Sequence, residues 1–115
     1  MNVVIVGQDP YPQLGVADGI SFSCSKKDKI EKSLNYIFDE IVKTVYTPMI
    51  GEEKLKLLKE GLNPDLKRWS KQGILMLNTA LTVQIGKIGS HYNIWDGFIN
   101  NIFKELDKRS DLIIV

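Results

Sequence analysis

The chain has 115 residues, of which 43% are hydrophobic and 25% are charged, the composition of an ordinary globular domain. Fifteen basic and fourteen acidic residues leave a formal charge of +1, so net charge neither favours nor excludes a nucleic acid partner. The one cysteine, Cys24, excludes an internal disulfide, and with a single histidine it leaves too few ligands for a typical zinc site. No apolar run approaches the ~20 residues of a membrane span.

The first predicted element is a strand over Val3–Val6, because a continuous β-branched run is typical of strands covered on both faces of a parallel sheet. Gly7 then allows a sharp turn. Gln8, Asp9 and Tyr11 follow at the carboxyl end of the strand, where open α/β sheets bind their ligands. An amide, a carboxylate and a phenol are therefore expected together on one short loop.

Helical patterns occupy the middle of the chain. An amphipathic helix is predicted before Pro48, and a shorter, highly charged one over Glu52–Glu60. A third is predicted to start with Asn63 as its N-cap and Pro64 as its first helical residue, and to carry Trp69 inward. The apolar positions of the first helix recur at the spacing of one helix face and are Ile30, Leu34, Ile37, Phe38, Ile41 and Val45.

Two more strands and a helix are predicted in the second half. Ile74–Leu77 is a buried-strand pattern that ends in the polar Asn78, and Leu112–Val115 is another. Between them a helix is predicted to start at Asn93 as its N-cap. The apolar stripe expected on this helix is Ile94, Phe98, Ile102 and Leu106.

The alternation of strands and helices predicts a single α/β domain over residues 1–115, a three-layer α/β/α sandwich with a central parallel sheet. Because the chain opens and closes on a core strand, we expect this sheet to be incomplete, as in a piece of a longer fold. If the first two strands are neighbours, Asp9 and Asn78 lie just beyond adjacent strand ends. Their loops then converge on one pocket.

Each polar residue of this pocket is a weak functional signal on its own. The pair Asp9-Pro10 is typical of a turn, an asparagine after a strand usually caps backbone groups, and His91 has the setting of a loop hydrogen-bonding residue. The dinucleotide and P-loop glycine patterns and the serine-hydrolase elbow are absent from the sequence. The side chains that remain suit a flat heterocycle, with a carboxylate facing a developing positive charge.

A series of short motifs resembles the family 1 uracil-DNA glycosylases in order and spacing, over nearly the whole chain. They are GQDPY at 7–11, GISFS at 19–23, SL at 33–34, WSKQG at 69–73, LN at 77–78, LTV at 81–83 and SH at 90–91, with Trp95 after them. The resemblance implies an enzyme of base-excision repair that hydrolyses the N-glycosidic bond of uracil in single- or double-stranded DNA, without a metal or cofactor. Such enzymes flip the nucleotide out of the duplex.

The resemblance also implies roles for individual residues. Asp9 would be the catalytic residue, which stabilises the oxocarbenium-like sugar and orients the attacking water. Gln8 would bind a uracil oxygen through its backbone N–H, and Tyr11 would exclude the methyl group of thymine. Phe22 would stack on uracil, and Asn78 would read the edge that separates uracil from cytosine.

The remaining implied contacts are with the DNA backbone. Ser33 would bind a phosphate from a helix start, and His91 would support the DNA or the pocket. The resemblance further implies a monomeric, intracellular protein of the cytoplasm or nucleus, with no membrane partner.

The chain also departs from the family pattern. Pro12 stands where the family commonly has a histidine that helps to hold the water, and Tyr46–Glu60 looks like an insertion. Relative to the family, the chain is expected to be truncated at both ends. It would then lack the segment that supplies a histidine to the uracil anion and a leucine wedge to the duplex. We therefore expect the chain by itself to be poorly active.

Two other interpretations stay open on the sequence alone. One is a glycosylase-like module kept for DNA binding, as an accessory subunit in replication with catalysis dispensable. The other is an unrelated small-molecule-binding α/β domain. The presence of Asp9 favours the enzyme, because a binding module gains nothing from a carboxylate beside DNA phosphates.

Overall fold

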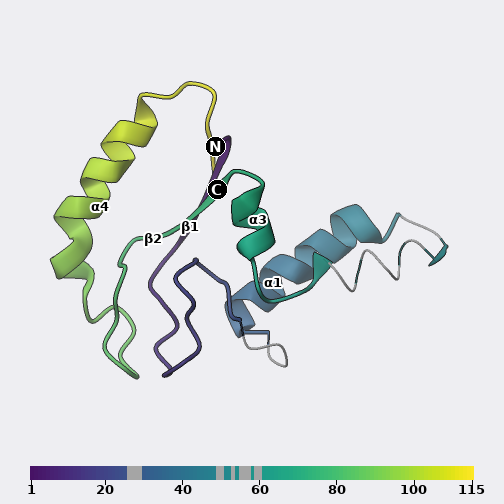
Figure 1. The fold of residues 1–115 in the computed structure, drawn as a ribbon, viewed down its shortest axis with the longest axis horizontal. Helices are drawn as coiled ribbons and strands as arrows, with labels where there is room; N and C mark the ends of the chain where they lie inside the picture. The colour runs from purple at the N-terminus through teal and green to yellow at the C-terminus, as the bar shows by residue number, and fades with distance from the viewer. Residues whose placement is uncertain (26–29, 49–50, 53, 55–57, 59–60) are drawn as a thin grey trace.

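The computed structural model describes residues 1–25, 30–48, 51–52, 54, 58 and 61–115 of the chain, and Figure 1 shows how the elements are arranged. In that part, β1 (Val3–Gly7), β2 (Ile74–Asn78) and β3 (Ile113–Ile114) form one parallel sheet with the order β2-β1-β3. The first strand is the central one, which agrees with its unbroken β-branched sequence, and its Val4 is fully buried.

The register of β1 with β2 brings the ends of both strands to the same edge of the sheet. Val3 pairs with Ile74 and Gly7 pairs with Asn78, so the two strands leave the sheet side by side. The pairing continues past the strands, because the N–H of Thr79 donates to the Gly7 carbonyl at 3.0 Å. The first two strands are neighbours, so the condition on which the sequence predicted convergence of their loops is met.

Helices lie on both sides of this sheet. In Figure 1, α4 (Tyr92–Asp107) runs along one side, while α3 (Lys67–Lys71) and α1 (Lys32–Ile41) lie on the other. The last turn of α1 continues into a π-helical segment, η1 (Val42–Tyr46). The predicted α/β class, with a parallel sheet between helices, is confirmed. None of the helices in the described part combines the length and the apolar character needed to cross a bilayer.

The main core lies between α1, α3 and β2. Leu34 and Phe38 of α1 pack with Leu66 and Met76, and all four side chains are buried. The ring of Trp69 meets Phe38 edge-on with the ring centroids 6.2 Å apart. The predicted inward orientation of Leu34, Phe38 and Trp69 therefore agrees with the packing on this side of the sheet.

Both predicted N-caps are wrong. Asn63 does not cap α3, because its side-chain oxygen accepts the N–H of Asp65 at 3.0 Å in a local turn, and the helix starts later at Lys67. Asn93 lies within the first turn of α4, which begins at Tyr92. Short polar side chains form turns as readily as they cap helices, so their pattern does not fix which of the two forms.

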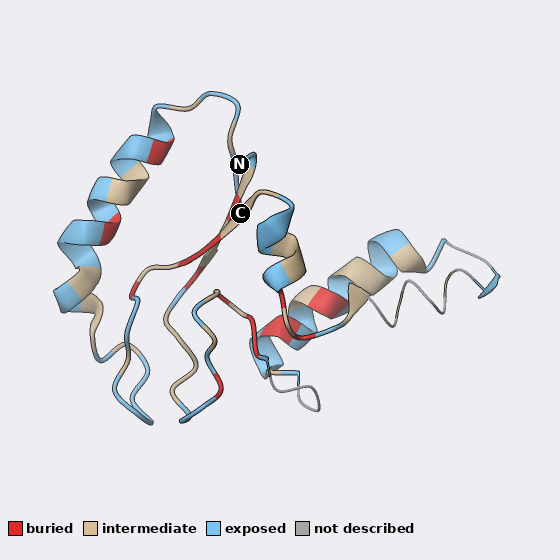
Figure 2. Cartoon of the chain, viewed as in Figure 1, coloured by how far each residue is buried: buried red, intermediate tan, exposed pale blue. Residues whose placement is uncertain are grey.

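The buried face of α4 also differs from the predicted stripe. Ile99 and Leu106 are buried, whereas Ile94 and Phe98 are 70% and 52% exposed. Figure 2 shows that the buried positions of α4 face the sheet and that most of the helix surface is exposed. The helix thus meets the sheet along a narrower face than its apolar residues could cover. The helix predicted over Glu52–Glu60 falls mostly on residues outside the described part.

Candidate active site

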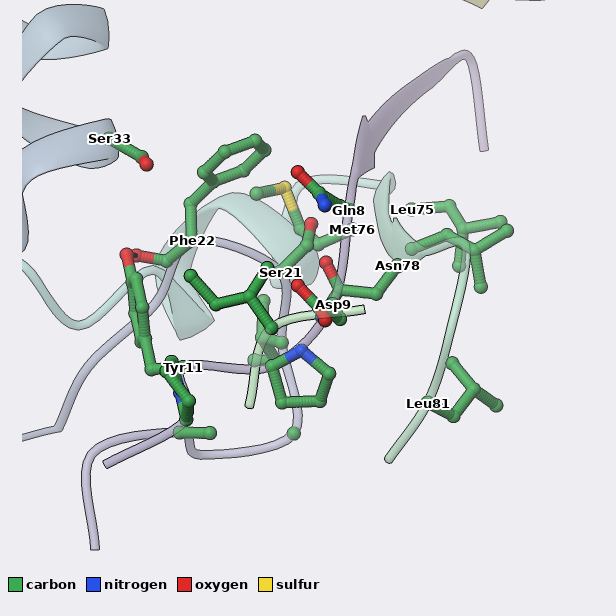
Figure 3. Close-up of a pocket in the computed structure, with 17 residues that line it drawn as sticks. Gln8, Asp9, Tyr11, Ser21, Phe22, Ser33, Leu75, Met76, Asn78 and Leu81 are labelled. Carbon is green, nitrogen blue, oxygen red and sulfur yellow. Dashed lines mark hydrogen bonds between the residues drawn. The ribbon is translucent and has the colours of Figure 1, made fainter. Parts of the chain in front are cut away.

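A pocket of about 550 Å³ opens at the edge of the sheet where β1 and β2 end (Figure 3). Its walls come from the loop after β1, the segment 17–22, the first turn of α1 and the end of β2. The residues predicted for the site that line this pocket are Gln8, Asp9, Tyr11, Phe22, Ser33 and Asn78. The remaining one, His91, lies outside the pocket wall, directly before α4.

The positions of the Asn78 and Phe22 side chains depend on the missing side chain of Gly7. A Cβ at this position would collide with the side-chain oxygen of Asn78, and it would lie 3.2 Å from the Cβ of Ser21 and 3.3 Å from the Phe22 ring. Gly7 is not among the glycines with positive φ, so the predicted need for a sharp turn is not its reason. Glycine is required because the Asn78 amide and the Phe22 ring both approach the backbone here.

Phe22 is held in a backbone conformation that few side chains adopt. Its φ is +64°, in the left-handed region, where a residue with a bulky side chain is strained. The Tyr11 hydroxyl donates a hydrogen bond to the Phe22 carbonyl at 2.6 Å. Burial raises the pKa of Tyr11 well above its usual value, and the nearby Glu31 carboxylate raises it further, so the hydroxyl keeps the proton that it donates. Two predicted substrate-binding residues are thereby tied together.

A buried serine connects the same segment to α3. The Ser23 hydroxyl donates to Asp18 at 2.7 Å and accepts the N–H of Leu66 at 2.8 Å, and the Ser23 side chain is fully buried. Asp18 also accepts the N–H of Ile20 at 3.2 Å and the hydroxyl proton of Ser25 at 2.8 Å. Sequence reasoning missed Asp18. Its only signal was an acidic residue shortly before two serines, a pattern typical of many loops.

Asp9 is held by one of its two carboxylate oxygens. Its Oδ2 accepts the backbone N–H of Gly89 at 2.5 Å, whereas no hydrogen bond to Oδ1 forms among the described residues. The neighbouring Gln8 is fixed through its carbonyl, which accepts the N–H of Ala80 at 3.0 Å and the hydroxyl proton of Thr79 at 2.8 Å. In the described part of the chain the N–H of Gln8 has no partner. A free carboxylate oxygen and a free amide donor are therefore both available at the pocket.

His91 belongs to a second group of contacts in the loop before α4. Its Nδ1 lies 2.8 Å from the Thr82 hydroxyl, which accepts the indole N–H of Trp95 at 2.7 Å. In the same loop the Ser90 hydroxyl accepts the N–H of Gln84 at 2.8 Å. Sequence reasoning assigned no role to Thr82 or to Gly89. A backbone donor such as that of Gly89 leaves no trace in the residue type.

The geometry suits a flat, polar ring. An aromatic face (Phe22), a side-chain amide (Asn78) and a free backbone donor (Gln8) surround one space, with the Asp9 carboxylate beside it. Pro12 also lines the pocket, and its side chain offers no hydrogen bond to a water molecule. Within the described residues, no group of three or more histidine, cysteine or acidic side chains is placed to hold a metal ion.

The curated proteins similar to this chain include uracil-DNA glycosylases of several bacteria. The chain is 41% identical over 115 residues to a uracil-DNA glycosylase of Borreliella burgdorferi, with 99% of this chain and 47% of that protein covered. It is 39% identical to a uracil-DNA glycosylase of Aliarcobacter butzleri, with 99% of this chain and 49% of that protein covered. The chain thus spans about half the length of the curated relatives it matches. No protein-family model matches it.

The fold leads to the same group of proteins. The crystal structure of mimivirus uracil-DNA glycosylase superposes with a TM-score of 0.79 at 30% identity, covering 99% of this chain and 40% of that one. A variant of the mimivirus protein, solved in complex with UGI, superposes equally well. The resemblance inferred from the sequence motifs is therefore confirmed over the whole length of the chain.

Proposed function

We propose that this chain, which is homologous over its whole length to uracil-DNA glycosylases, carries the uracil pocket and the catalytic carboxylate of a DNA N-glycosylase. The reaction is hydrolysis of the bond between uracil and deoxyribose, the first step of base-excision repair. The observation that carries the proposal is the position of Asp9. Its carboxylate has one oxygen fixed by Gly89 and one oxygen free, next to a pocket of the right chemistry for a pyrimidine.

The chemistry follows from the charge that develops on the sugar. As the glycosidic bond breaks, its electron pair leaves with uracil and positive charge grows at the anomeric carbon, and the Asp9 carboxylate lowers the energy of that charge. Its free Oδ1 accepts a proton from the attacking water and so orients the water toward the carbon. Because the Gly89 N–H holds Oδ2, the carboxylate does not have to reorganise during the reaction.

The base is recognised by the other side chains of the pocket. Phe22 stacks on the uracil ring, and the Asn78 amide, which carries both a donor and an acceptor, reads the edge of the base. The free N–H of Gln8 donates to a uracil oxygen. Tyr11, fixed by its bond to the Phe22 carbonyl, occupies the space where thymine carries its methyl group.

The DNA backbone is held at the rim of the pocket. Ser33 lies in the first turn of α1 and lines the pocket, so its hydroxyl and the helix start together suit a phosphate. His91 lies before α4, two residues after the Gly89 that contacts Asp9. The protein acts on uracil-containing DNA as a monomer inside the cell, and the target nucleotide is flipped out of the stack.

The test is uracil release from a labelled single-stranded oligonucleotide. Two proteins are compared: this chain, and a chimera in which the Borreliella burgdorferi relative supplies the half that the chain does not match. We expect release by the chimera and little or none by the chain alone, because a site that lacks even one preorganised donor typically loses ~100- to 1000-fold in rate.

Asp9→Asn in the chimera should reduce release by at least ~100-fold while DNA affinity stays within about twofold, because the substitution removes the charge and keeps the shape. Asp39→Asn, an exposed residue of α1, is the matched control and should change neither quantity. Equal loss of release and of binding in Asp9→Asn would argue against a catalytic role. Tight DNA binding with no release by any version would favour the accessory replication module.

A further inference from the structure

Three side chains form a hydrogen-bonded chain at the start of α4. The indole N–H of Trp95 donates to the Thr82 hydroxyl at 2.7 Å, and the same hydroxyl lies 2.8 Å from Nδ1 of His91. These residues come from the two ends of the loop that carries Gly89 to Asp9. The proposed function assigns His91 to the DNA backbone but gives Thr82 and Trp95 no part in it.

The types of the three groups limit where the protons are. A tryptophan indole is a donor only, so it occupies one of the two acceptor positions of the Thr82 oxygen. In the described part of the chain, the other side-chain contact of this hydroxyl is Nδ1 of His91, which the hydroxyl can meet either as a donor or as an acceptor. Where the hydroxyl donates to Nδ1, this nitrogen carries no proton and the ring proton of the neutral His91 is on Nε2.

The second ring nitrogen is available for a ligand. Among the described residues Nε2 of His91 forms no hydrogen bond. His91 is two residues from Gly89, whose N–H contacts the carboxylate that acts on the sugar. The loop that holds the Asp9 carboxylate thus also carries this ring, and side-chain donors to DNA phosphates position a protein on DNA.

We propose that Thr82 is a positioning residue, which together with Trp95 holds His91 as the Nε2–H tautomer and so presents one fixed donor to a DNA phosphate. The DNA part of this statement rests on the proposed function, whereas the tautomer part does not. The two parts are measured separately.

The tautomer is measured on the chain without DNA. His91 is the only histidine of the sequence, so its ring signals in a long-range ¹H–¹⁵N correlation spectrum need no assignment. At about pH 8.5, we expect the pattern of a single Nε2–H tautomer. An Nδ1–H pattern in the unmodified chain would overturn the proposal, and this outcome requires no variant to fold.

Two substitutions test the part played by the hydroxyl. Thr82→Val keeps the shape of the side chain and removes the hydroxyl that links Trp95 to His91, so the ring should become a mixture of tautomers. Thr82→Ser keeps the hydroxyl and should show the single pattern of the unmodified chain. Thr44→Val, whose hydroxyl bonds the Glu40 carbonyl on α1, is the matched control and should leave the ring unchanged. An unchanged tautomer in Thr82→Val would show that the hydroxyl does not set it.

The DNA part is measured as the affinity for a short single-stranded oligonucleotide over a series of salt concentrations. Loss of one oriented hydrogen bond should weaken binding by Thr82→Val about 2- to 10-fold, and Thr82→Ser should bind like the unmodified chain. If Thr82→Val mixes the tautomers and leaves DNA affinity unchanged, the role of Thr82 in setting the tautomer is supported and the proposed phosphate contact of His91 is wrong. If no version binds DNA even as part of the chimera with the Borreliella burgdorferi relative, the proposed function fails instead.

Discussion

The two sides of the sheet are held together in different ways. On the side of α1 and α3, apolar packing around Leu34 and Leu66 is combined with a buried serine, Ser23, whose hydrogen bonds join positions 18 and 66. On the side of α4, the helix buries Ile99 and Leu106 but leaves much of its apolar surface exposed. The first side is a packed core with internal hydrogen bonds, and the second is attached over a small area.

The parts of the candidate site divide along the same line. Phe22, Tyr11 and Ser33, which would bind the base and the backbone, belong to the densely packed side. The contact that fixes the Asp9 carboxylate comes from Gly89, in the loop before α4. The proposed base contacts are therefore on the densely packed side of the molecule, while the carboxylate proposed to be catalytic depends on a loop of the lightly packed side.

The largest effect that separates the two sides is on stability. Leu66→Ala should lower the free energy of unfolding by about 2–5 kcal/mol, because Leu66 is fully buried in the core and its removal leaves a cavity. Ile94→Ala on α4 should change it by less than about 0.5 kcal/mol, because that side chain is 70% exposed. Urea unfolding of both variants measures the difference. Similar losses of unfolding free energy would contradict the proposed difference between the two sides of the sheet.

A smaller effect tests the buried hydrogen bonds of the packed side. Ser23→Ala removes the acceptor of the Leu66 N–H and a donor to Asp18, so it should cost about 1–3 kcal/mol of unfolding free energy. Ser25→Ala is the matched control, since Ser25 donates to the same Asp18 oxygen from an exposed position and its loss should cost less than about 0.5 kcal/mol. Thermal or urea unfolding measures both variants. Equal losses of unfolding free energy would show that the buried hydrogen bonds of Ser23 contribute no more than the exposed one of Ser25.

The smallest predicted effect is on base selection. Tyr11→Ala opens the space where thymine carries its methyl group, so the affinity for free thymine relative to uracil should rise about tenfold. Tyr11→Phe keeps the ring and removes only the hydroxyl, and should still disfavour thymine. Chemical-shift titrations of the chain with both bases give the two affinities. A Tyr11→Ala variant that discriminates as before would rule out exclusion by Tyr11.

The sequence predicted the structure correctly where a residue pattern is typical of a single structural role. The β-branched run at Val3–Val6 predicted a strand covered on both faces of a parallel sheet, and the positions of Asp9 and Asn78 after two strands predicted that their loops meet if the strands are neighbours. It failed where a short polar side chain has several uses, as at Asn63, which forms a turn in place of a cap. It also could not show that Phe22 adopts a positive φ, because that conformation is rare for a bulky side chain and the residue type gives no sign of it.

Gly7 has a consequence for how this pocket can change in evolution. Every substitution at position 7 places a carbon where the Asn78 side chain and the Phe22 ring lie against the backbone. Strand pairing and the positions of two pocket side chains therefore depend on one residue, and any side chain at that position has to displace them. A lineage that acquires a different ligand does so more directly through the walls of the pocket, at positions such as Tyr11 or Asn78.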